Sequence, residues 1–502
     1  MLKQQINYLL KRSNTPRTIK AIDIFSRRSD KHIYQLNSTF LFNPASNLKI
    51  VTTSFALQSL GIYHKFKTSF MTSGVQNGGH LAGDLLVAAC GDPLIDHNDL
   101  DSVARIISSN GIRQIDGNII IDISKFDTLE WGSGWMWDDE PSDYQMFISP
   151  ACLDHNTISV EVSLDSASNK LDVRTKPATK FVRIVSTAAP DTIDSLYVTR
   201  EMEDDTNIVS VSGKYSRYLS ASEYAFSVRH PAEYFGTVLR ERLESHGINV
   251  GGRVIVKSSD MKSWYRRELD TLFVLENPID TVVTYVNKVS DNLGAECLLR
   301  EVPSELYNCA GSAENGIKFE KVFLEGCGID STEYYIVDGS GLSHYDLLTP
   351  EAIVKVLSHD LDQQFRDVFM RSLPVSGVDG TLNRRMTSDV TRGKVLAKTG
   401  SIGGVSTLSG YVLLPRDTLV FSMMMQNYVA RGDSLRALQD SMCAMLSLYN
   451  SKAAIFRSGL ERHNVGSFRP VHVRRESHKG KFRKIRRKQL PSRIEKNETH
   501  AR

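Results

Sequence analysis

Ser46 and Lys49 are the first residues of the chain whose types and spacing could do chemistry. Pro44 suits the first turn of a helix and Asn43 suits its N-cap, so together they predict a helix start here. Residues three apart on a helix share a face, which brings the Lys49 amine to the Ser46 hydroxyl. The free N–H groups of the helix N-terminus add partial positive charge where an oxyanion would form. A serine placed in this way can act as a nucleophile if Lys49 is neutral enough to accept its proton.

Ser-x-x-Lys alone is a weak pattern, because serines and lysines at this spacing are common on surface helices. Two further motifs follow it in order, Ser290-Asp291-Asn292 and Lys398-Thr399-Gly400-Ser401. The first lies in a stretch of helical periodicity, and the second ends a strand-like run that we expect at a sheet edge. This ordered trio is the motif set of serine β-lactamases and penicillin-binding proteins, which the chain therefore resembles.

Longer motifs narrow the resemblance to one family. Residues 338–343 (Asp-Gly-Ser-Gly-Leu-Ser) and 373–382 (Leu-Pro-Val-Ser-Gly-Val-Asp-Gly-Thr-Leu) look like those of class C low-molecular-mass penicillin-binding proteins, as do residues 91–94 and 153–156. These are the D-alanyl-D-alanine carboxypeptidase/endopeptidases of peptidase family S13. The 244 positions from Ser46 to Ser290 also match that family, whereas class A β-lactamases lack so large an insertion there. The resemblance covers roughly residues 15–450.

The resemblance implies a penicillin-sensitive serine D,D-peptidase. It would hydrolyse the terminal D-Ala-D-Ala bond of peptidoglycan stem peptides, and also D-Ala–diamino-acid cross-links. Ser46 would attack the carbonyl to give an acyl-enzyme that water hydrolyses. Lys49 is the expected base, its pKa lowered by repulsion from Lys398. Ser290 would relay a proton to the leaving amine, and the Asn292 amide would orient Lys49 and the substrate carbonyl.

Substrate binding is expected from the third motif. Lys398, Thr399 and the Ser401 hydroxyl would hold the substrate's C-terminal carboxylate, and the backbone N–H groups of Ser46 and Ser401 would form the oxyanion hole. Asp154 is a weaker candidate for contact with a basic group of the stem peptide, since a structural aspartate in a turn would look the same. β-Lactams mimic the D-Ala-D-Ala terminus, so they are expected to acylate Ser46 and to leave slowly.

Two alternative functions stay open from the sequence. A β-lactamase or esterase on the same scaffold would need efficient deacylation, and the chain shows no glutamate in a recognisable deacylation motif. A catalytically dead module that only binds peptidoglycan would have no reason to keep all of the five residues Ser46, Lys49, Ser290, Asn292 and Lys398. The intact set therefore favours the enzyme.

Composition excludes several other classes of function. The six cysteines form no Cys-x-x-Cys pair, and the zinc-protease and phosphate-loop motifs are missing, so no metal and no cofactor is expected. No apolar run is long enough to span a bilayer. The N-terminus shows no signal peptide, yet peptidoglycan lies outside the cytoplasmic membrane, so the resemblance predicts a periplasmic or other extracytoplasmic location.

The net charge of +3 conceals an asymmetry. Residues 451–502 hold 16 Lys and Arg against 4 Asp and Glu, whereas the rest of the chain is mildly acidic. Such a segment is typical of a disordered tail that could meet an anionic surface, and no nucleic-acid partner is expected. The sequence leaves the oligomeric state open.

Periodicity predicts an α/β (α+β) protein, and the resemblance implies the fold of the serine β-lactamases and penicillin-binding proteins. Residues 1–73 and 262–450 are expected to form one discontinuous catalytic domain, interrupted by a strand-rich insertion over residues 74–261 that holds one or two subdomains. Helical stretches are expected at 5–12, after residue 43, and at 99–109, 232–246, 281–300, 313–325, 350–362 and 434–449. Strands are expected at 18–25, 32–37, 85–89, 118–122, 158–162, 181–185, 208–212, 253–256, 395–398, 408–414 and 418–425, so that Met423, Met424 and Met425 lie in a strand core.

Overall fold

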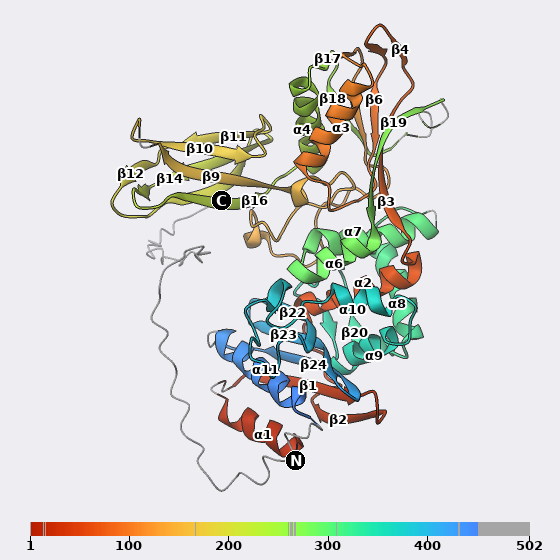
Figure 1. Ribbon diagram of the computed structural model, residues 1–502, viewed down its shortest axis with the longest axis vertical. Helices are drawn as coiled ribbons and strands as arrows, with labels where there is room; N and C mark the ends of the chain where they lie inside the picture. The colour runs from red at the N-terminus through yellow and green to blue at the C-terminus, as the bar shows by residue number, and fades with distance from the viewer. Residues whose placement is uncertain are drawn as a thin grey trace, which may run out of the picture. The chain divides into compact units, whose positions relative to one another are not determined.

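A five-stranded antiparallel sheet is the centre of the part of the chain that carries Ser46 and Lys398 (Figure 1). The computed structural model describes residues 2–449, apart from residues 14, 16, 166, 260, 262–264, 266, 267, 308, 430 and 431. The predicted basic tail, residues 451–502, lies outside the described residues. In spatial order the strands of this sheet are β2 (Lys31–Leu36), β1 (Ile19–Ser26), β24 (Asp417–Gln426), β23 (Val405–Leu414) and β22 (Val395–Ile402).

Both faces of this sheet are covered, so its central strands are apolar on both sides. Successive strand residues point to opposite faces: Met423 and Met425 belong to one hydrophobic cluster and Met424 to the other. The three methionines are strand core, as the sequence predicts. β22 is an edge strand, which places the Lys398 motif at the sheet edge.

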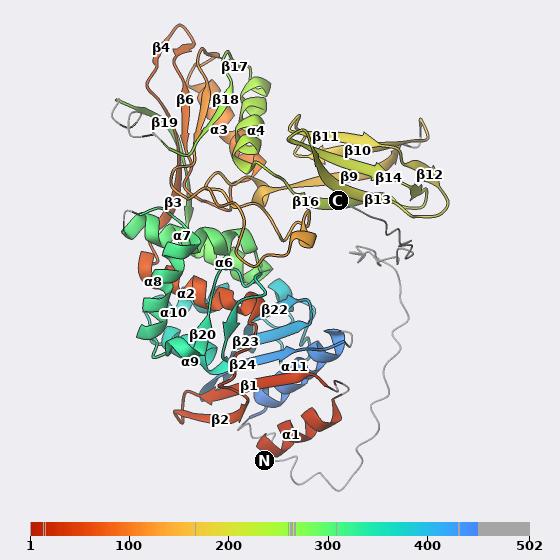
Figure 2. The same ribbon diagram turned by 180° about the vertical axis from the view of Figure 1, so that it is seen from behind.

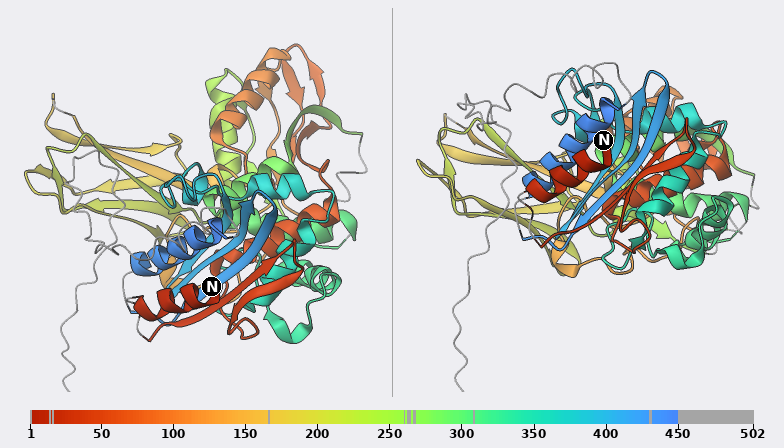
Figure 3. Two further views of the ribbon diagram at one scale, coloured as in Figure 1. Left: turned by 60° about the horizontal axis from the view of Figure 1, so that its bottom comes forward. Right: turned by 90° about the horizontal axis from the view of Figure 1, so that it is seen from below.

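Helices flank the sheet on its two faces. One pair, α1 (Leu2–Arg12) and α11 (Gly432–Ser447), runs along one face (Figure 3). The cluster on the other face is built by α2 (Leu48–Leu60), α6 (Ile279–Val289), α7 (Asn292–Leu306), α8 (Ala313–Gly326), α9 (Pro350–Asp360) and α10 (Arg366–Ser372). Side chains cap the N-termini of two of these helices: Thr349 caps α9 before Pro350, and Ser312 caps α8.

The single helix expected over residues 281–300 is wrong, because the chain forms two helices there. α6 ends at Ser290, which takes the left-handed conformation with φ 68°. Asp291 then caps α7, its carboxylate accepting a hydrogen bond from the Gly294 N–H at 2.6 Å. Apolar periodicity continues across the break, so it could not reveal the turn that carries the Ser290 motif.

The helix expected after residue 43 also begins differently. A 3-10 turn, η1 (Ala45–Asn47), comes first, and α2 follows at Leu48. Ala45 takes a positive φ of 46°, and its N–H donates to Asn43 Oδ1 at 2.8 Å. Asn43 is therefore not the N-cap that the sequence predicts, because Pro44 takes that position for η1 and Asn47 for α2. Ser46 lies in the tight turn and Lys49 in the first turn of α2.

The region between α2 and α6 has its own sheets and core (Figure 2). Its largest sheet contains, in order, β18 (Val254–Lys257), β8 (Ile119–Asp122), β6 (Leu85–Ala88), β3 (Lys65–Thr72) and β19 (Asp270–Pro278). The helices α3 (His97–Ser109) and α4 (Pro231–Ser245) pack against each other and on this sheet. The division of the chain into domains stays a prediction.

The remaining strands form smaller sheets. They are β17 (Asn249–Val250), β7 (Gln114–Ile115), β5 (His80–Ala82) and β4 (Val75–Asn77); β10 (Lys170–Lys176), β9 (Thr157–Asp165) and β16 (Ala221–Ser227); β11 (Val182–Ser186), β14 (Thr206–Ser212) and β13 (Tyr197–Glu203); β12 (Ala189–Asp191) and β15 (Lys214–Ser216); and β20 (Tyr334–Tyr335) and β21 (Leu347–Leu348). Short 3-10 turns lie at η2 (Trp137–Asp139), η3 (Asp154–Asn156), η4 (Ser331–Glu333) and η5 (Gly380–Leu382). Within the described residues, no helix has the length and apolar character needed to cross a membrane.

Candidate active site

Lys49 joins the first two predicted motifs. Its Nζ lies 3.1 Å from Ser46 Oγ and 2.5 Å from Asn292 Oδ1. A third oxygen, the backbone carbonyl of Ser340, accepts from the same Nζ at 2.6 Å. The structure thus brings Ser46, Lys49 and Asn292 together, although Asn292 comes from α7, more than 240 residues further along the chain.

Lys398 joins the second and third motifs. Its Nζ donates to Ser290 Oγ at 2.8 Å and to the carbonyl of Thr399 at 2.9 Å. The left-handed turn at Ser290 points this hydroxyl toward β22 instead of continuing the helix. The Thr399 hydroxyl donates to Thr381 Oγ1 at 2.9 Å, in the motif of residues 373–382.

The edge strand β22 passes directly beside the start of α2. A Cβ on Gly400 would lie 2.2 Å from Thr407 Oγ1 and 3.0 Å from both the Pro44 carbonyl and the Ser46 nitrogen. Only a glycine lets the strand come this close. The Asn47 amide locks the two elements together by donating to the Lys398 carbonyl at 2.8 Å.

The candidate residues differ sharply in exposure. Lys49 and Lys398 are fully buried, whereas Ser46, Ser290 and Thr399 are half-buried and Ser401 is exposed. The two amines therefore lie under the site, and the hydroxyl groups line its open side.

Burial controls the protonation of both lysines. It lowers the pKa of Lys49 to about 8, against the opposing influence of carboxylates led by Asp338. Burial and then repulsion from Lys49 lower the pKa of Lys398 well below its usual value. Repulsion from Lys398 was expected to be the cause of the low pKa of Lys49, but burial is its main cause.

Buried carboxylates hold the turn that supplies the Ser340 carbonyl. Glu296 Oε1 accepts the N–H groups of Gly339 and Ser340, each at 2.9 Å, while its Oε2 pairs with Arg300 at 2.8 Å. Asp338 accepts two further N–H groups of the same turn, from Gly341 and Ser343, and shares the Ser340 N–H with Glu296. Burial raises the pKa of Glu296.

The inserted region also reaches the site. Asn292 Nδ2 donates to the backbone carbonyl of Tyr144 at 2.7 Å, and the buried Trp135 indole donates to Asp338 Oδ2 at 2.9 Å. Asp154 is placed differently: its Oδ1 accepts from His97 Nδ1 at 2.8 Å, beside the start of α3. Asp154 thus has a structural partner. Within the described residues, its hydrogen bonds do not reach any of the five predicted catalytic residues.

Sequence reasoning missed several contributors to the site. Glu296 and Asn47 could be found from the sequence, because Glu296 lies one helical turn after Asn292 and Asn47 directly follows Ser46. The carbonyls of Ser340 and Tyr144 could not be found in this way, since every residue has a carbonyl. The turn of residues 338–343 comes close to η1 through a glycine, since a Cβ on Gly341 would lie 2.0 Å from the Ala45 carbonyl oxygen.

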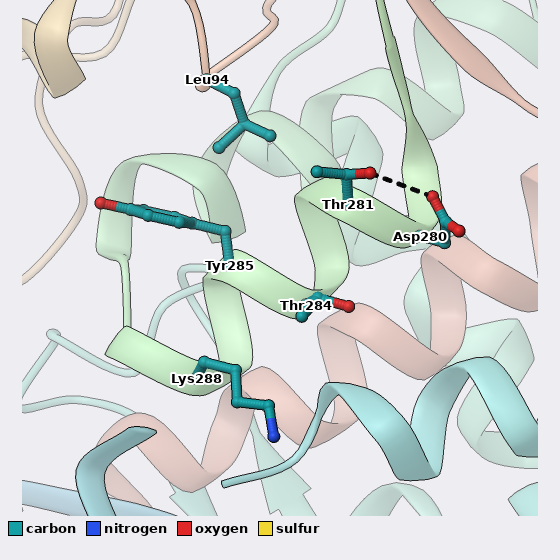
Figure 4. A pocket seen from close by; sticks show the side chains of 6 residues that line it. All are labelled: Leu94, Asp280, Thr281, Thr284, Tyr285 and Lys288. Atoms are coloured by element: carbon teal, nitrogen blue, oxygen red, sulfur yellow. Dashed lines mark hydrogen bonds between the residues drawn. The ribbon is translucent and has the colours of Figure 1, made fainter. Parts of the chain in front are cut away.

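A separate pocket lies along the outer face of α6 (Figure 4). Leu94 of the inserted region lines it together with Asp280, Thr281, Thr284, Tyr285 and Lys288 of the helix. The last residue that lines the pocket, Lys288, lies two positions before Ser290 in the sequence. The Lys288 ammonium is paired with Asp379. Within the described residues, no group of three or more His, Cys, Asp or Glu side chains is placed to hold a metal ion.

A half-buried serine three residues before a buried lysine, an asparagine amide on that lysine and a second lysine on an edge strand define the serine acyl-transfer class of penicillin-binding proteins and β-lactamases. Within this class, the chain belongs to the D-Ala-D-Ala carboxypeptidase 3 (S13) family, whose model matches residues 2–449. The predicted family and its serine peptidase activity class are confirmed, and the alternatives, a dead module or a β-lactamase, are not favoured.

Known proteins similar to the chain agree in fold and in length. A D-alanyl-D-alanine carboxypeptidase of Actinomadura sp. (strain R39) is 28% identical over 462 residues, which cover 89% of this chain and 85% of the relative. The crystal structure of penicillin binding protein 4 (dacB) from Haemophilus influenzae superposes with a TM-score of 0.77 at 23% identity, over 88% of this chain and 99% of that one. A predatory peptidoglycan endopeptidase of Bdellovibrio bacteriovorus, Bd3459, gives a TM-score of 0.51 at 16% identity, over 86% and 94%. The predicted fold class is confirmed.

Proposed function

We propose that the protein cleaves D-Ala-D-Ala bonds through an acyl-enzyme on Ser46, with Lys49 as the base. The observation that carries this proposal is the 3.1 Å contact between Lys49 Nζ and Ser46 Oγ at a lysine whose pKa lies at about 8. Neutral Lys49 takes the Ser46 proton as Oγ attacks the carbonyl carbon, and Asn292 holds the amine in place from the other side.

The leaving amine and the negative charge need partners on the open side of the site. Ser290, hydrogen-bonded to Lys398, returns a proton to the departing D-alanine amine. The backbone N–H groups of Ser46 and Ser401 stabilise the oxyanion; Gly400 brings β22 close to the Ser46 nitrogen. Lys398, Thr399 and Ser401 hold the substrate carboxylate, and Asp154 is a weaker candidate for the basic group of the stem peptide.

The same chemistry extends to D-Ala–diamino-acid cross-links, because both reactions cut a bond after D-alanine. We therefore propose endopeptidase activity besides carboxypeptidase activity, and an extracytoplasmic location, where peptidoglycan is found. Release of D-alanine from a pentapeptide tests the first activity, and cleavage of a cross-linked muropeptide dimer tests the second.

Intact-mass analysis after incubation with benzylpenicillin tests the nucleophile. Wild type should gain one penicilloyl group, and Ser46→Ala none, because the covalent bond forms at Ser46 Oγ. Ser168→Ala, in the exposed turn after β9, is the matched control and should still be labelled. An adduct on Ser46→Ala, or an unlabelled wild type, would contradict the proposal. Rapid turnover of a chromogenic cephalosporin would instead favour a β-lactamase.

A further inference from the structure

Two cysteines far apart in the chain lie in contact with each other. Cys152, of the inserted region, and Cys297, of α7, have their Sγ atoms 3.8 Å apart. Both side chains are fully buried, in a small hydrophobic cluster with Phe126, Met146 and Leu293. The activity described above uses neither thiol.

The two elements that carry these thiols also carry candidate site residues. On α7, Asn292 and Glu296 are four residues apart and share the face toward Lys49 and the turn at Ser340, while Leu293 and Cys297 share the neighbouring face. Cys152 directly precedes the turn of residues 153–156, in which Asp154, His155 and Asn156 all take positive φ. His155 in turn stacks on Tyr285 and pairs with Asp291, the cap of α7.

We propose that Cys152 and Cys297 form a disulfide that joins the inserted region to α7 when the protein folds under oxidising conditions. The sulfur atoms must approach by about 1.8 Å to reach bonding distance, a shift that side-chain rotation and small backbone adjustments supply. Both thiols lose their protons and the pair loses two electrons. A disulfide of a thiol oxidase or of oxidised glutathione accepts them in two exchange steps and leaves as two thiols.

The surroundings explain when the bond forms and what it does. The hydrogen bond with Cys297 and then burial raise the pKa of Cys152, which keeps its reactive thiolate scarce in the folded protein. Exchange is therefore fast during folding and slow afterwards, in either direction. The bond holds the turn of residues 153–156 against the helix whose first residue, Asn292, positions Lys49.

Thiol counting on the full chain tests the proposal. The protein is refolded either with oxidised glutathione or with dithiothreitol, then denatured and alkylated with iodoacetamide. Reduced protein should show all six cysteines alkylated, and oxidised protein two fewer, with a mass about 2 Da lower before alkylation. Proteolysis should release one peptide pair, containing Cys152 and Cys297, that separates only after reduction.

Variants and a folding readout make the test decisive. We expect oxidation to raise the thermal midpoint of unfolding of the wild type. Cys152→Ala and Cys297→Ala should each abolish the cross-link and this rise. Cys309→Ser, at a half-buried cysteine, should keep both. Cooperative unfolding of the oxidised wild type shows that it is folded. Folded oxidised protein with six alkylated cysteines, or a cross-link to another cysteine such as Cys90, would overturn the proposal, as would a cross-link found only in unfolded protein.

Discussion

Two opposing influences meet at Lys49. Complete burial favours its neutral form, while the carboxylates of Asp338, Asp291 and Glu296 favour its charged form. The outcome is a pKa of about 8, close to neutral pH, where a general base is most effective. The same burial acts on Lys398 with no such carboxylates among its main influences, which leaves the two amines with different proton affinities.

The pH dependence of acylation follows from this pKa. Below pH 8 the neutral fraction of Lys49 falls about tenfold per pH unit, so we predict that the rate of benzylpenicillin acylation rises with pH up to about 8 and levels off above it. Time-resolved intact-mass measurements between about pH 6 and 9 check this. Lys49→Ala should acylate far more slowly at every pH. A flat wild-type profile would remove Lys49 from the role of base.

The close approach of β22 to η1 depends on the absence of a side chain at position 400. We predict that Gly400→Ala slows acylation by about 10- to 100-fold, because a methyl group forced against Thr407 and Pro44 moves the strand at a cost of about 1–3 kcal/mol. Gly403→Ala is the control on the same hairpin, since a Cβ there meets nothing within 4 Å. The rate of penicilloyl formation measures the effect, and equal rates for the two variants would contradict this role.

The packing of α8 on α2 places a carboxyl group in the core. Glu320 accepts from Thr52 Oγ1 at 3.2 Å, and burial raises its pKa to about 8. Above about pH 4.5 the unfolded chain loses this proton while the folded chain keeps it, so the contribution of Glu320 to stability falls as pH rises through the window from 4.5 to about 8.

We therefore predict that the unfolding free energy falls less for Glu320→Gln than for wild type when the pH is raised from 5 to 9. The two decreases should differ by on the order of 4 kcal/mol. Urea denaturation at the two pH values measures the difference in unfolding free energy. Glu314→Gln, at an exposed position of the same helix, should behave as wild type. If Glu320→Gln shows the wild-type pH dependence, Glu320 is ionised in the folded protein.

At the scale of the whole molecule, the inserted region contacts the proposed active site. Tyr144 supplies the carbonyl that fixes the Asn292 amide, and Trp135 donates to the carboxylate that shapes the turn at Ser340. Gly134 permits this docking, because a Cβ there would lie 2.4 Å from Ser343 Oγ. The insertion thus supports the positions of Asn292 and Ser340 around Lys49.

We predict that Trp135→Phe slows acylation by about 3- to 10-fold, because Asp338 loses one hydrogen bond worth about 1 kcal/mol or slightly more. Trp131→Phe is the matched control, since Trp131 packs edge-on against Trp135 and at a tilt against Phe147, and this substitution keeps an aromatic ring. Acylation kinetics at constant pH give the readout. A wild-type rate in Trp135→Phe would show that the turn is held without the inserted region.

Most of the regular elements could be predicted from local pattern, because alternation and helical periodicity are properties of neighbouring residues. The Lys398 strand at a sheet edge and the methionine strand were found in this way. The break between α6 and α7 was not, since it depends on one left-handed residue, Ser290, inside an unbroken apolar period.

The sequence by itself determined which side chains are available for the chemistry, and in which order, because Ser46 and Lys49 are neighbours on one local element. Only the tertiary structure decided what surrounds them. The carbonyls of Ser340 and Tyr144, the burial that brings the pKa of Lys49 to about 8, and the contact between Cys152 and Cys297 all join distant parts of the chain. Every residue has a backbone carbonyl, so residue type does not show which carbonyl will contact Lys49. Desolvation depends on every atom packed around a group, so it cannot be inferred from spacing along the sequence either.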